Sequence, residues 1–280
     1  MIGFDSLNTA PKISVLMGVY NCRDTIKESI DSIINQTFTD WELVICDDGS
    51  TDDTVSLVEE YKEVLGDKLV IIKHQKNMGL NCTLNDCLNV AKGEFVARMD
   101  GDDISLPNRF ERELLEFQKE PDISVVSCPM IYFDEENGDY YCGRVHNVYP
   151  NKKNLVYGTV HSHAPCMVKT DVMRAVGGYT VDKKLLRVED WNLWLKVYAA
   201  GYKGKNIPDL LYKMRDDKNA KKRRIFQNRL NEAYMTYLVV KTFNFPFYMY
   251  FYMLRPIIVG LLPDFLYNYL HRKSMNNPNN

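Results

Sequence analysis

The 280-residue chain has no marked excess of either charge and no closely spaced cysteine pair, and its apolar C-terminal part lacks a membrane-spanning run. The formal net charge of −2 argues against a nucleic-acid partner. Seven cysteines without a C-x-x-C spacing predict reduced, mostly buried thiols instead of a disulfide framework. Residues 1–10 are polar and lack the apolar core of a signal peptide, so a cytoplasmic protein is expected.

The first half of the chain alternates strand and helix patterns. Short apolar, β-branched runs predict strands, and each is followed by apolar residues at helical spacing. The expected strands are 13–19, 41–46, 69–73 and 95–99, and the expected helices are 24–36, 80–91 and one beginning near residue 52. This alternation predicts an α/β fold with a mainly parallel sheet covered by helices on both faces. Ligands bind such sheets beyond the carboxyl ends of the strands.

The second half is less regular. We expect a helix over residues 107–119, a strand over 123–128, a hairpin or active-site loop over 132–148, and a helix over 189–200. The last helix carries Trp191, Trp194, Leu195 and Tyr198 on one face. This aromatic stripe is interpreted as core, in preference to a sugar-binding platform.

Three carboxylates, those of Asp100, Asp102 and Asp103, fall within four residues at the end of the strand predicted over 95–99. Carboxylates this close repel each other unless a cation or donor groups neutralise them, and their hard oxygens suit Mg²⁺ or Mn²⁺. A metal with few protein ligands completes its shell with water and substrate phosphates. A plain acidic turn and a phosphatase-like aspartyl nucleophile remain alternatives. A calcium loop fits poorly, because Pro107 interrupts it.

A second acidic pair, Asp47 and Asp48, ends the strand predicted over 41–46. Because parallel strands end at the same edge of a sheet, this pair and the Asp100 cluster are expected to converge on one ligand. The alternative is that Asp47 and Asp48 cap the following helix, which is a common use of aspartate.

The tail changes character after about residue 215. A basic run, Lys218 with residues 221–224, precedes an aromatic and apolar segment over 242–270. The longest uncharged stretch of this segment, residues 242–254, has 13 residues and is too short to span a bilayer. Helices lying on a membrane surface fit the pattern, and the alternative is an appendage packed on the main domain or on a second subunit.

Several segments in order resemble the family 2 glycosyltransferases, which are inverting enzymes with the GT-A (nucleotide-diphospho-sugar transferase) fold. The matching segments are 13–21, 36–38, 41–52, 77–80, 91–94 and 95–107, followed by His163, residues 177–179 and 189–191. The resemblance covers roughly residues 11–215. It implies a GT-A domain over 1–215, with a nucleotide half at about 11–106 and an acceptor half at about 107–215, and a helical extension over 216–280.

The resemblance also implies roles for single residues on the donor side. Asp48 would accept a hydrogen bond from the uracil of a UDP-sugar, and the backbone from Gly18 to Tyr20 would line the base. Asp100 would lie near the ribose, and Asp102 would bind a Mn²⁺ or Mg²⁺ ion that bridges the diphosphate.

On the acceptor side, the resemblance makes Asp190 the general base that deprotonates the acceptor hydroxyl. Glu189, His163 and Asp103 would have acceptor or secondary roles. Without the resemblance, Glu189 and Asp190 are interpreted as caps of the helix that they begin, Asp103 as a cap before the helix at Pro107, and His163 as a core histidine.

The sequence departs from many relatives at Gly18, where proline or threonine often stands, and it lacks a Gln-x-x-Arg-Trp motif, which argues against a processive polymerase. The expected function is therefore the transfer of one sugar to a glycan or lipid-linked glycan in cell-surface polysaccharide synthesis. The expected location is cytoplasmic or peripheral on the inner membrane face, and an oligomer is compatible with the sequence. A metal-dependent phosphatase or phosphotransferase and a non-catalytic nucleotide-sugar binding module are the alternatives.

Overall fold

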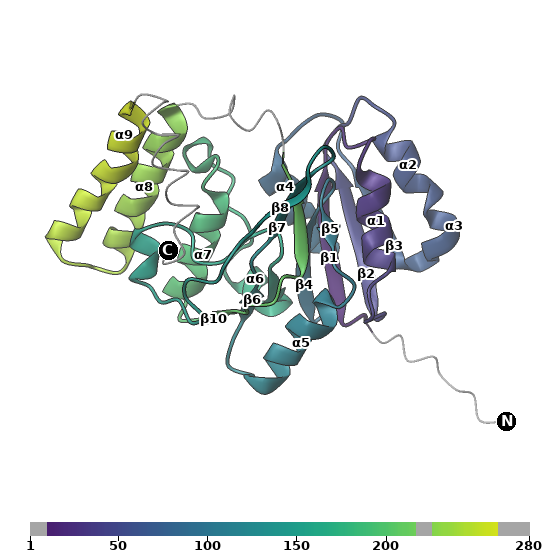
Figure 1. Ribbon diagram of the computed structural model, residues 1–280, viewed down its shortest axis with the longest axis horizontal. Coiled ribbons are helices and arrows are strands. Elements are labelled where there is room, and N and C mark those ends of the chain that lie inside the picture. The colour runs from purple at the N-terminus through teal and green to yellow at the C-terminus, as the bar shows by residue number, and fades with distance from the viewer. Residues whose placement is uncertain (1–9, 217–225, 263–280) are drawn as a thin grey trace.

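The computed structural model describes residues 10–216 and 226–262. A central sheet of seven strands has the order β10-β6-β9-β4-β1-β2-β3 (Figure 1). Its strands are β1 (Ile13–Val19), β2 (Trp41–Asp47), β3 (Leu69–Lys73), β4 (Phe95–Asp100), β6 (Val125–Ser127), β9 (Met167–Lys169) and β10 (Gly204–Asn206). All pairings are parallel except those of β9, which runs antiparallel to β4 and β6. The predicted α/β class and mainly parallel sheet are confirmed.

A second sheet has the order β5-β11-β7-β8. It consists of β5 (Ile104–Ser105), β11 (Tyr212–Arg215), β7 (Ile131–Asp134) and β8 (Gly138–Cys142). The antiparallel pair β7 and β8 is the hairpin that the sequence predicted within 132–148. Because β5 directly follows β4, this small sheet lies over the carboxyl end of β4 (Figure 1).

Helices cover both faces of the central sheet (Figure 1). They are α1 (Ile26–Ile34), α2 (Thr54–Glu60), α3 (Lys62–Leu65), α4 (Leu80–Val90), α5 (Arg109–Lys119), α6 (Thr170–Ala175) and α7 (Glu189–Ala199), followed by α8 (Phe226–Thr242) and α9 (Leu254–Leu261). Short 3₁₀ segments are η1 (Gly66–Lys68), η2 (Asn154–Val156), η3 (Lys183–Leu185) and η5 (Phe247–Met253). Helix α5 begins at Arg109, two residues later than Pro107 suggested.

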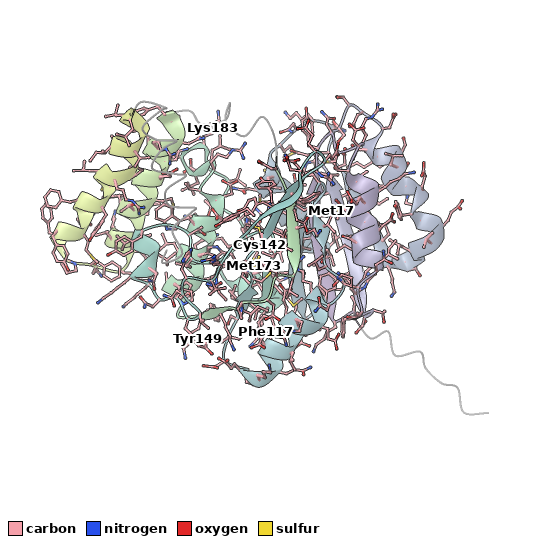
Figure 2. All side chains as sticks on the ribbon, viewed as in Figure 1. Met17, Phe117, Cys142, Tyr149, Met173 and Lys183 are labelled. Atoms are coloured by element: carbon pink, nitrogen blue, oxygen red, sulfur yellow. The ribbon has the colours of Figure 1, made fainter. Side chains whose placement is uncertain are left out.

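Alternating residues of β1 belong to two separate hydrophobic clusters, one on each face of the sheet. Met17 faces the cluster that contains Phe117 of α5, and both side chains are labelled in Figure 2. Leu16 faces the opposite cluster, with residues of α4, α7 and α8. This alternation is the two-residue period of a strand buried on both faces.

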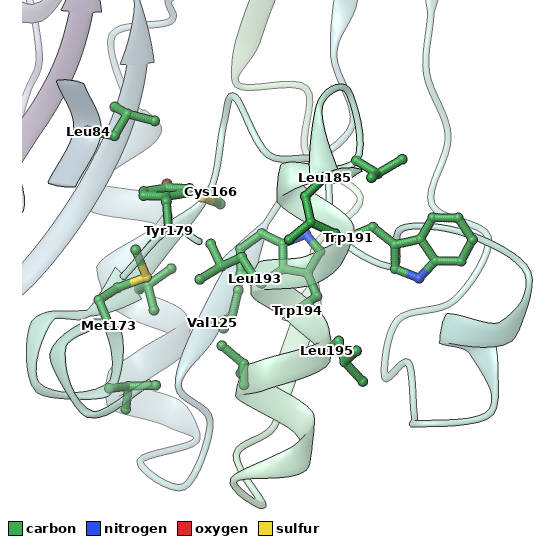
Figure 3. Close-up of a cluster of buried hydrophobic side chains, with 14 of the residues drawn as sticks. Leu84, Val125, Cys166, Met173, Tyr179, Leu185, Trp191, Leu193, Trp194 and Leu195 are labelled. Atoms are coloured by element: carbon green, nitrogen blue, oxygen red, sulfur yellow. The ribbon is translucent and has the colours of Figure 1, made fainter. Parts of the chain in front are cut away.

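The aromatic stripe of α7 belongs to the second cluster, as predicted. Trp191, Trp194 and Leu195 are buried, and Figure 3 shows them among Leu185, Leu193 and neighbouring core side chains. Each indole N–H donates to a carbonyl oxygen, from Trp191 to Leu155 at 2.8 Å and from Trp194 to His161 at 3.2 Å. A buried indole with its donor satisfied is a core residue.

The C-terminal helices pack on this same cluster. Met235, Val239 and Val240 of α8 and Met249 of η5 are buried in it. The predicted appendage is therefore joined to the main domain through apolar contacts. The basic run at 218–224, and the part of the tail beyond residue 262, lie outside the described residues. Across 10–216 and 226–262, no helix combines the length and apolar character needed to cross a membrane.

Candidate functional site

The two acidic clusters meet at one edge of the central sheet. Strand β1 lies between β2 and β4, and Gly18 pairs with Cys46 on one side and Asp100 on the other. All three strands are parallel, so Asp48, directly after β2, and Asp100, the last residue of β4, lie at the same edge with β1 between them. The predicted placement of both clusters at the carboxyl edge is confirmed.

Within the Asp100 cluster, the side chains face two different cavities. Asp100 lines a cavity of about 780 Å³ together with Arg98, His163, Glu189 and Asp190. Asp102 instead lines a cavity of about 420 Å³ that also contains Tyr20, Asn21 and Arg215. The small sheet contributes to both cavities, with Met214 in the larger one and Arg215 in the smaller one. Asp100 and Asp102 therefore line separate cavities, although they lie two residues apart at the end of β4.

Arg98, in β4, connects the two sides of the larger cavity. One guanidinium nitrogen, Nη2, lies 2.7 Å from Oδ1 of Asp100. The other, Nη1, lies 2.7 Å from Nδ1 of His163. Burial of an arginine requires such partners, because its charge persists at any ordinary pH. Arg98 thus fixes Asp100 and His163 relative to each other.

The contact with Arg98 also determines which ring nitrogen of His163 carries the proton. Arginine only donates hydrogen bonds, so Nδ1 of His163 accepts and its Nε2–H donates to the hydroxyl of Tyr179 at 2.9 Å. Burial, and secondarily the charge of Arg98, holds the pKa of His163 well below its usual value. His163 is therefore a neutral residue whose ring nitrogens are both engaged, and it is poorly suited to act as a base.

Glu189 and Asp190 begin α7 and line the same cavity. Neither is the N-cap residue, which is Val188. Burial raises the pKa of both carboxyl groups, and at Asp190 a hydrogen bond from the backbone N–H of Trp191 partly opposes this rise. A carboxylate with a raised pKa is a stronger base than an exposed one, so either side chain has the chemistry that proton removal needs.

Around Asp102 the charges are crowded. Burial and then the nearby Asp100 raise the pKa of Asp102. Burial raises the pKa of Asp103 well above its usual value, with Asp100 and Asp102 adding to the effect. A cation would relieve this repulsion, so the residues fit a divalent ion held by Asp102. In the described part of the chain, no group of three or more His, Cys, Asp or Glu side chains is arranged to hold a metal.

Asp103 does not cap α5, whose N-cap is Asn108. Its Oδ1 accepts the backbone N–H of Arg215 at 2.9 Å, while its buried Oδ2 has no hydrogen-bond partner. Arg215 also donates from Nε to the carbonyl of Asp102 at 2.9 Å. Asp103 therefore holds β11 against the loop that carries Asp102, and the cap interpretation is wrong.

The cap interpretation is also wrong for Asp47 and Asp48. Oδ2 of Asp47 accepts the N–H groups of Gly49 and Ser50 at 3.1 and 3.0 Å, which closes a turn. Asp48 is buried and accepts the N–H groups of Met78 and Gly79 at 2.7 and 2.8 Å. The residue that bonds to the start of α2 is Asp52, through the N–H of Thr54.

Gly18 and Tyr20 lie on either side of the turn out of β1. A Cβ atom at Gly18 would come within 3.0 Å of Thr83 and 3.1 Å of Leu80, so α4 occupies the space that a larger residue would need. This packing explains why a residue without a side chain fits at position 18. Tyr20 is exposed and lines the smaller cavity.

Two arginines of the site, Arg98 and Arg215, were not predicted as site residues from the sequence. Arg98 interrupts an otherwise apolar strand two residues before Asp100, and a lone cation in a buried strand requires a partner. That pattern could have identified it. Arg215 lies more than one hundred residues after Asp102, so only the fold brings the two together.

Together, the central sheet, the helices that cover it and the cavities at its carboxyl edge correspond to the nucleotide-diphospho-sugar transferase (GT-A) fold. Solved structures support this fold. Staphylococcus aureus TarS in complex with UDP-GlcNAc matches with a TM-score of 0.67 at 19% identity, covering 89% of this chain and 71% of TarS. A mannosyltransferase of Pyrobaculum calidifontis in complex with GDP-Man and Mn²⁺ matches with a TM-score of 0.62 at 18% identity, covering 95% and 80%.

Sequence comparison gives the family. The model of glycosyl transferase family 2 matches residues 14–173. EpsE of Bacillus subtilis (strain 168), classed by name as a glycosyltransferase, is 35% identical over 97% of both chains. An Escherichia coli UDP-Gal:α-D-GlcNAc-diphosphoundecaprenol β-1,3-galactosyltransferase is 32% identical over 94% of this chain and 96% of its own length. The chain belongs to glycosyltransferase family 2 and has the GT-A fold, so the phosphatase alternative is set aside.

Proposed function

We propose that this enzyme is an inverting glycosyltransferase that moves one sugar from a UDP-sugar to a hydroxyl of a lipid-linked glycan in cell-surface polysaccharide synthesis. The observation that carries the proposal is the larger cavity, in which Asp190 and the Arg98–Asp100 pair line one space. Two relatives have names that include a UDP-sugar and a diphosphoundecaprenol-linked acceptor, which supports the choice of substrates.

The donor would lie along the carboxyl edge of β1, β2 and β4. Oδ1 of Asp48 already accepts two hydrogen bonds, from His74 and Met78, whereas Oδ2 accepts one, from Gly79. A carboxylate oxygen can accept two, so one position on Oδ2 suits the single ring N–H of uracil. Gly18 to Tyr20 would line the base, and Asp100 would lie near the ribose.

Asp102 would hold the divalent ion together with diphosphate oxygens and water. The ion would supply Lewis acidity that stabilises charge on the departing UDP. Arg215 lines the same cavity and is a cation that the described residues place there.

Asp190 would remove the proton from the acceptor hydroxyl. The hydroxyl oxygen then forms a bond to the anomeric carbon while the bond from that carbon to the UDP oxygen breaks. Because attack and departure occur on opposite faces, the configuration inverts in a single step. His163 is neutral and both of its ring nitrogens are engaged, so the carboxylates of Asp190 and Glu189 are the candidate bases in this part of the cavity.

An apolar surface beside this cavity fits a membrane-bound acceptor. The large exposed side chains of η5 and α9 recur at every third or fourth residue and so form one face: Phe247 (77% exposed), Phe251 (63%), Leu254 (49%), Ile258 (58%) and Leu261 (69%). We call this set the apolar face. Residues 233–263 contain no carboxylate, and their charged side chains are Lys241 and Arg255. An anionic bilayer surface would therefore not repel this face.

The apolar face also adjoins the acceptor side of the site. Tyr252 of η5 packs edge to face on Tyr157, with ring centroids 4.9 Å apart, and Tyr157 lines the larger cavity. We therefore propose that the face rests on the bilayer and presents the cavity to a lipid-linked glycan. The predicted peripheral membrane location follows from this arrangement.

Charged substitutions test the membrane proposal. A protein with both Phe251→Glu and Ile258→Glu is expected to lose co-flotation with anionic liposomes while its UDP affinity stays unchanged. Val64→Glu provides the control, because Val64 is 71% exposed and follows α2, at the opposite end of the molecule in Figure 1. Wild-type protein that never floats with liposomes contradicts the proposal, and a dimer dissociated by the same variants would assign the face to a second copy.

The reaction itself is tested with a panel of UDP-sugars, Mn²⁺ or Mg²⁺ and a prenyl diphosphate-linked glycan. One donor is expected to give UDP release that depends on the acceptor, with an inverted glycosidic product identified by NMR. Tight binding of UDP-sugars with no transfer to any acceptor would instead support the non-catalytic binding module.

A further inference from the structure

His74, directly after β3, lies between two carboxylates. Its Nδ1 is 2.8 Å from Oδ1 of Asp48, and its Nε2 is 2.9 Å from Oδ2 of Asp86 in α4. The His74 side chain is only 8% exposed. A neutral imidazole has a single N–H and can donate to only one of these partners. The geometry therefore favours the imidazolium, which donates to both.

The groups around His74 favour the same charge state. The Cys46 thiol of β2 faces the ring, with its Sγ 3.4 Å from Nε2, as does Asp48, which directly follows β2. From α4 the partner is Asp86. The pKa of His74 is raised, first by its hydrogen bond with Asp48 and then by that with Asp86, while burial opposes the rise. Its chain neighbour Lys73 pairs with Glu59 at 2.7 Å.

The Asp48 carboxylate joins His74 to the start of α4. It accepts the N–H groups of Met78 and Gly79, the two residues that precede that helix. Gly79 has a φ of +90°, a conformation that side chains rarely adopt, so this approach of the backbone to Asp48 depends on glycine. Among the residues that the structure describes, His74 is the side chain that donates to Asp48, in addition to the two backbone donors.

We infer that His74 is a positioning residue for the donor site, because its imidazolium orients Asp48 toward the base of the nucleotide and ties it to α4 through Asp86. This inference rests on the proposed uridine donor. It adds that donor affinity depends on the charge of a side chain that touches neither the sugar nor the diphosphate.

The sign of the pH effect follows from the raised pKa. Below that pKa the imidazolium donates to both carboxylates. As the pH rises through it, one of the two hydrogen bonds is lost, and Asp48 or Asp86 is released. UDP affinity is therefore expected to fall with rising pH by about fivefold or more, the lower end of coupling between linked sites.

The test measures UDP affinity in the presence of Mg²⁺ from about pH 5.5 to about pH 9, around the ordinary range of histidine. The terminal phosphate of UDP itself titrates near pH 6. His74→Gln, which keeps an N–H donor but cannot titrate, is therefore measured in parallel, and the difference from wild type is used. The difference in UDP affinity between the wild type and His74→Gln is expected to fall as the pH rises through the pKa of His74.

Asp86→Asn separates positioning from simple packing. Loss of this negative charge should lower the pKa of His74, and the midpoint of the affinity change should move to lower pH by about one unit. Glu59→Gln is the matched control, since it removes a carboxylate from the pair formed by the neighbouring Lys73, and it should leave the midpoint in place. A flat difference curve, or a midpoint that Asp86→Asn does not move, overturns the inference.

Failure of the donor proposal would be recognised separately. If no UDP binds at any pH, the proposed donor is wrong, but the ring protons of His74 still report its titration by NMR. A raised pKa that falls in Asp86→Asn would then support the imidazolium bridge itself, and an unshifted titration would reject it.

Discussion

Replacing Asp190 with asparagine is expected to reduce sugar transfer by about a hundredfold to ten-thousandfold, the usual range for loss of a general base. Asparagine keeps the shape of the side chain and can still accept the hydrogen bond from the backbone N–H of Trp191, but it cannot take a proton. Donor contacts on the sheet edge do not involve Asp190, so UDP affinity should stay near the wild-type value. Turnover and calorimetric UDP affinity are measured on the same preparation.

The pH profile gives an independent test of the same role. Burial raises the pKa of Asp190, and the base functions only when it is deprotonated. Wild-type turnover should therefore increase with pH through a pKa higher than that of an exposed aspartate. In the Asp190→Asn protein, turnover should no longer show this increase with pH.

Glu189→Gln is the matched control for Asp190→Asn, because Glu189 is adjacent, lines the same cavity and also has a pKa raised by burial. It should lower turnover much less. If Glu189→Gln has the larger effect, the base is Glu189. If Asp190→Asn abolishes UDP binding instead, Asp190 shapes the donor site and the catalytic assignment is wrong.

The order of strands and helices in the first half was predictable because each element carries its own local signal. The run of residues 13–19 is apolar at almost every position, which indicates a strand buried on both faces, and α4 has its apolar residues at helical spacing. The acidic pair and the cluster of three carboxylates at two strand ends were then enough to locate the edge of the sheet that carries the site.

Elements that depend on distant partners were not predictable in the same way. Strand β9 has three residues, and it is a strand only because β4 and β6 flank it in antiparallel pairing. The small sheet likewise joins β5, β7 and β11 across more than one hundred residues. No local periodicity marks such short segments, so the separation of Asp100 and Asp102 into two cavities also escaped prediction.

The roles of individual aspartates were also difficult to predict from the sequence. Aspartate caps helices, closes turns and binds ligands with the same carboxylate, so the sequence could not decide among these roles for Asp47, Asp48 and Asp103. The structure shows which hydrogen bonds each of these carboxylates accepts. Asp47 closes a turn and Asp103 holds β11, whereas Asp48 accepts hydrogen bonds from His74, Met78 and Gly79.

Removing the carboxylate of Asp102 should have the second large effect. Asp102→Asn takes away the charge that would hold the divalent ion, so turnover should fall by at least about a hundredfold, as expected when one electrostatic contact to the developing charge is lost. Metal-dependent UDP affinity should fall with it, because the diphosphate would lose the cation that neutralises it. In excess chelator, wild-type protein should show the same two losses, and added Mn²⁺ or Mg²⁺ should reverse them.

Asp24→Asn is the control for Asp102→Asn, because Asp24 lines the same cavity, is 89% exposed at its side chain and pairs only with Arg23 in the described residues. It makes the same change of charge without touching the crowded cluster, and it should leave both measurements unaltered. Binding of Mn²⁺ alone, followed by electron paramagnetic resonance, distinguishes a lost metal from a damaged fold. Full turnover of wild-type protein in chelator would show that transfer proceeds without the ion, and Arg215 would then be the group that must balance the charge of the departing diphosphate.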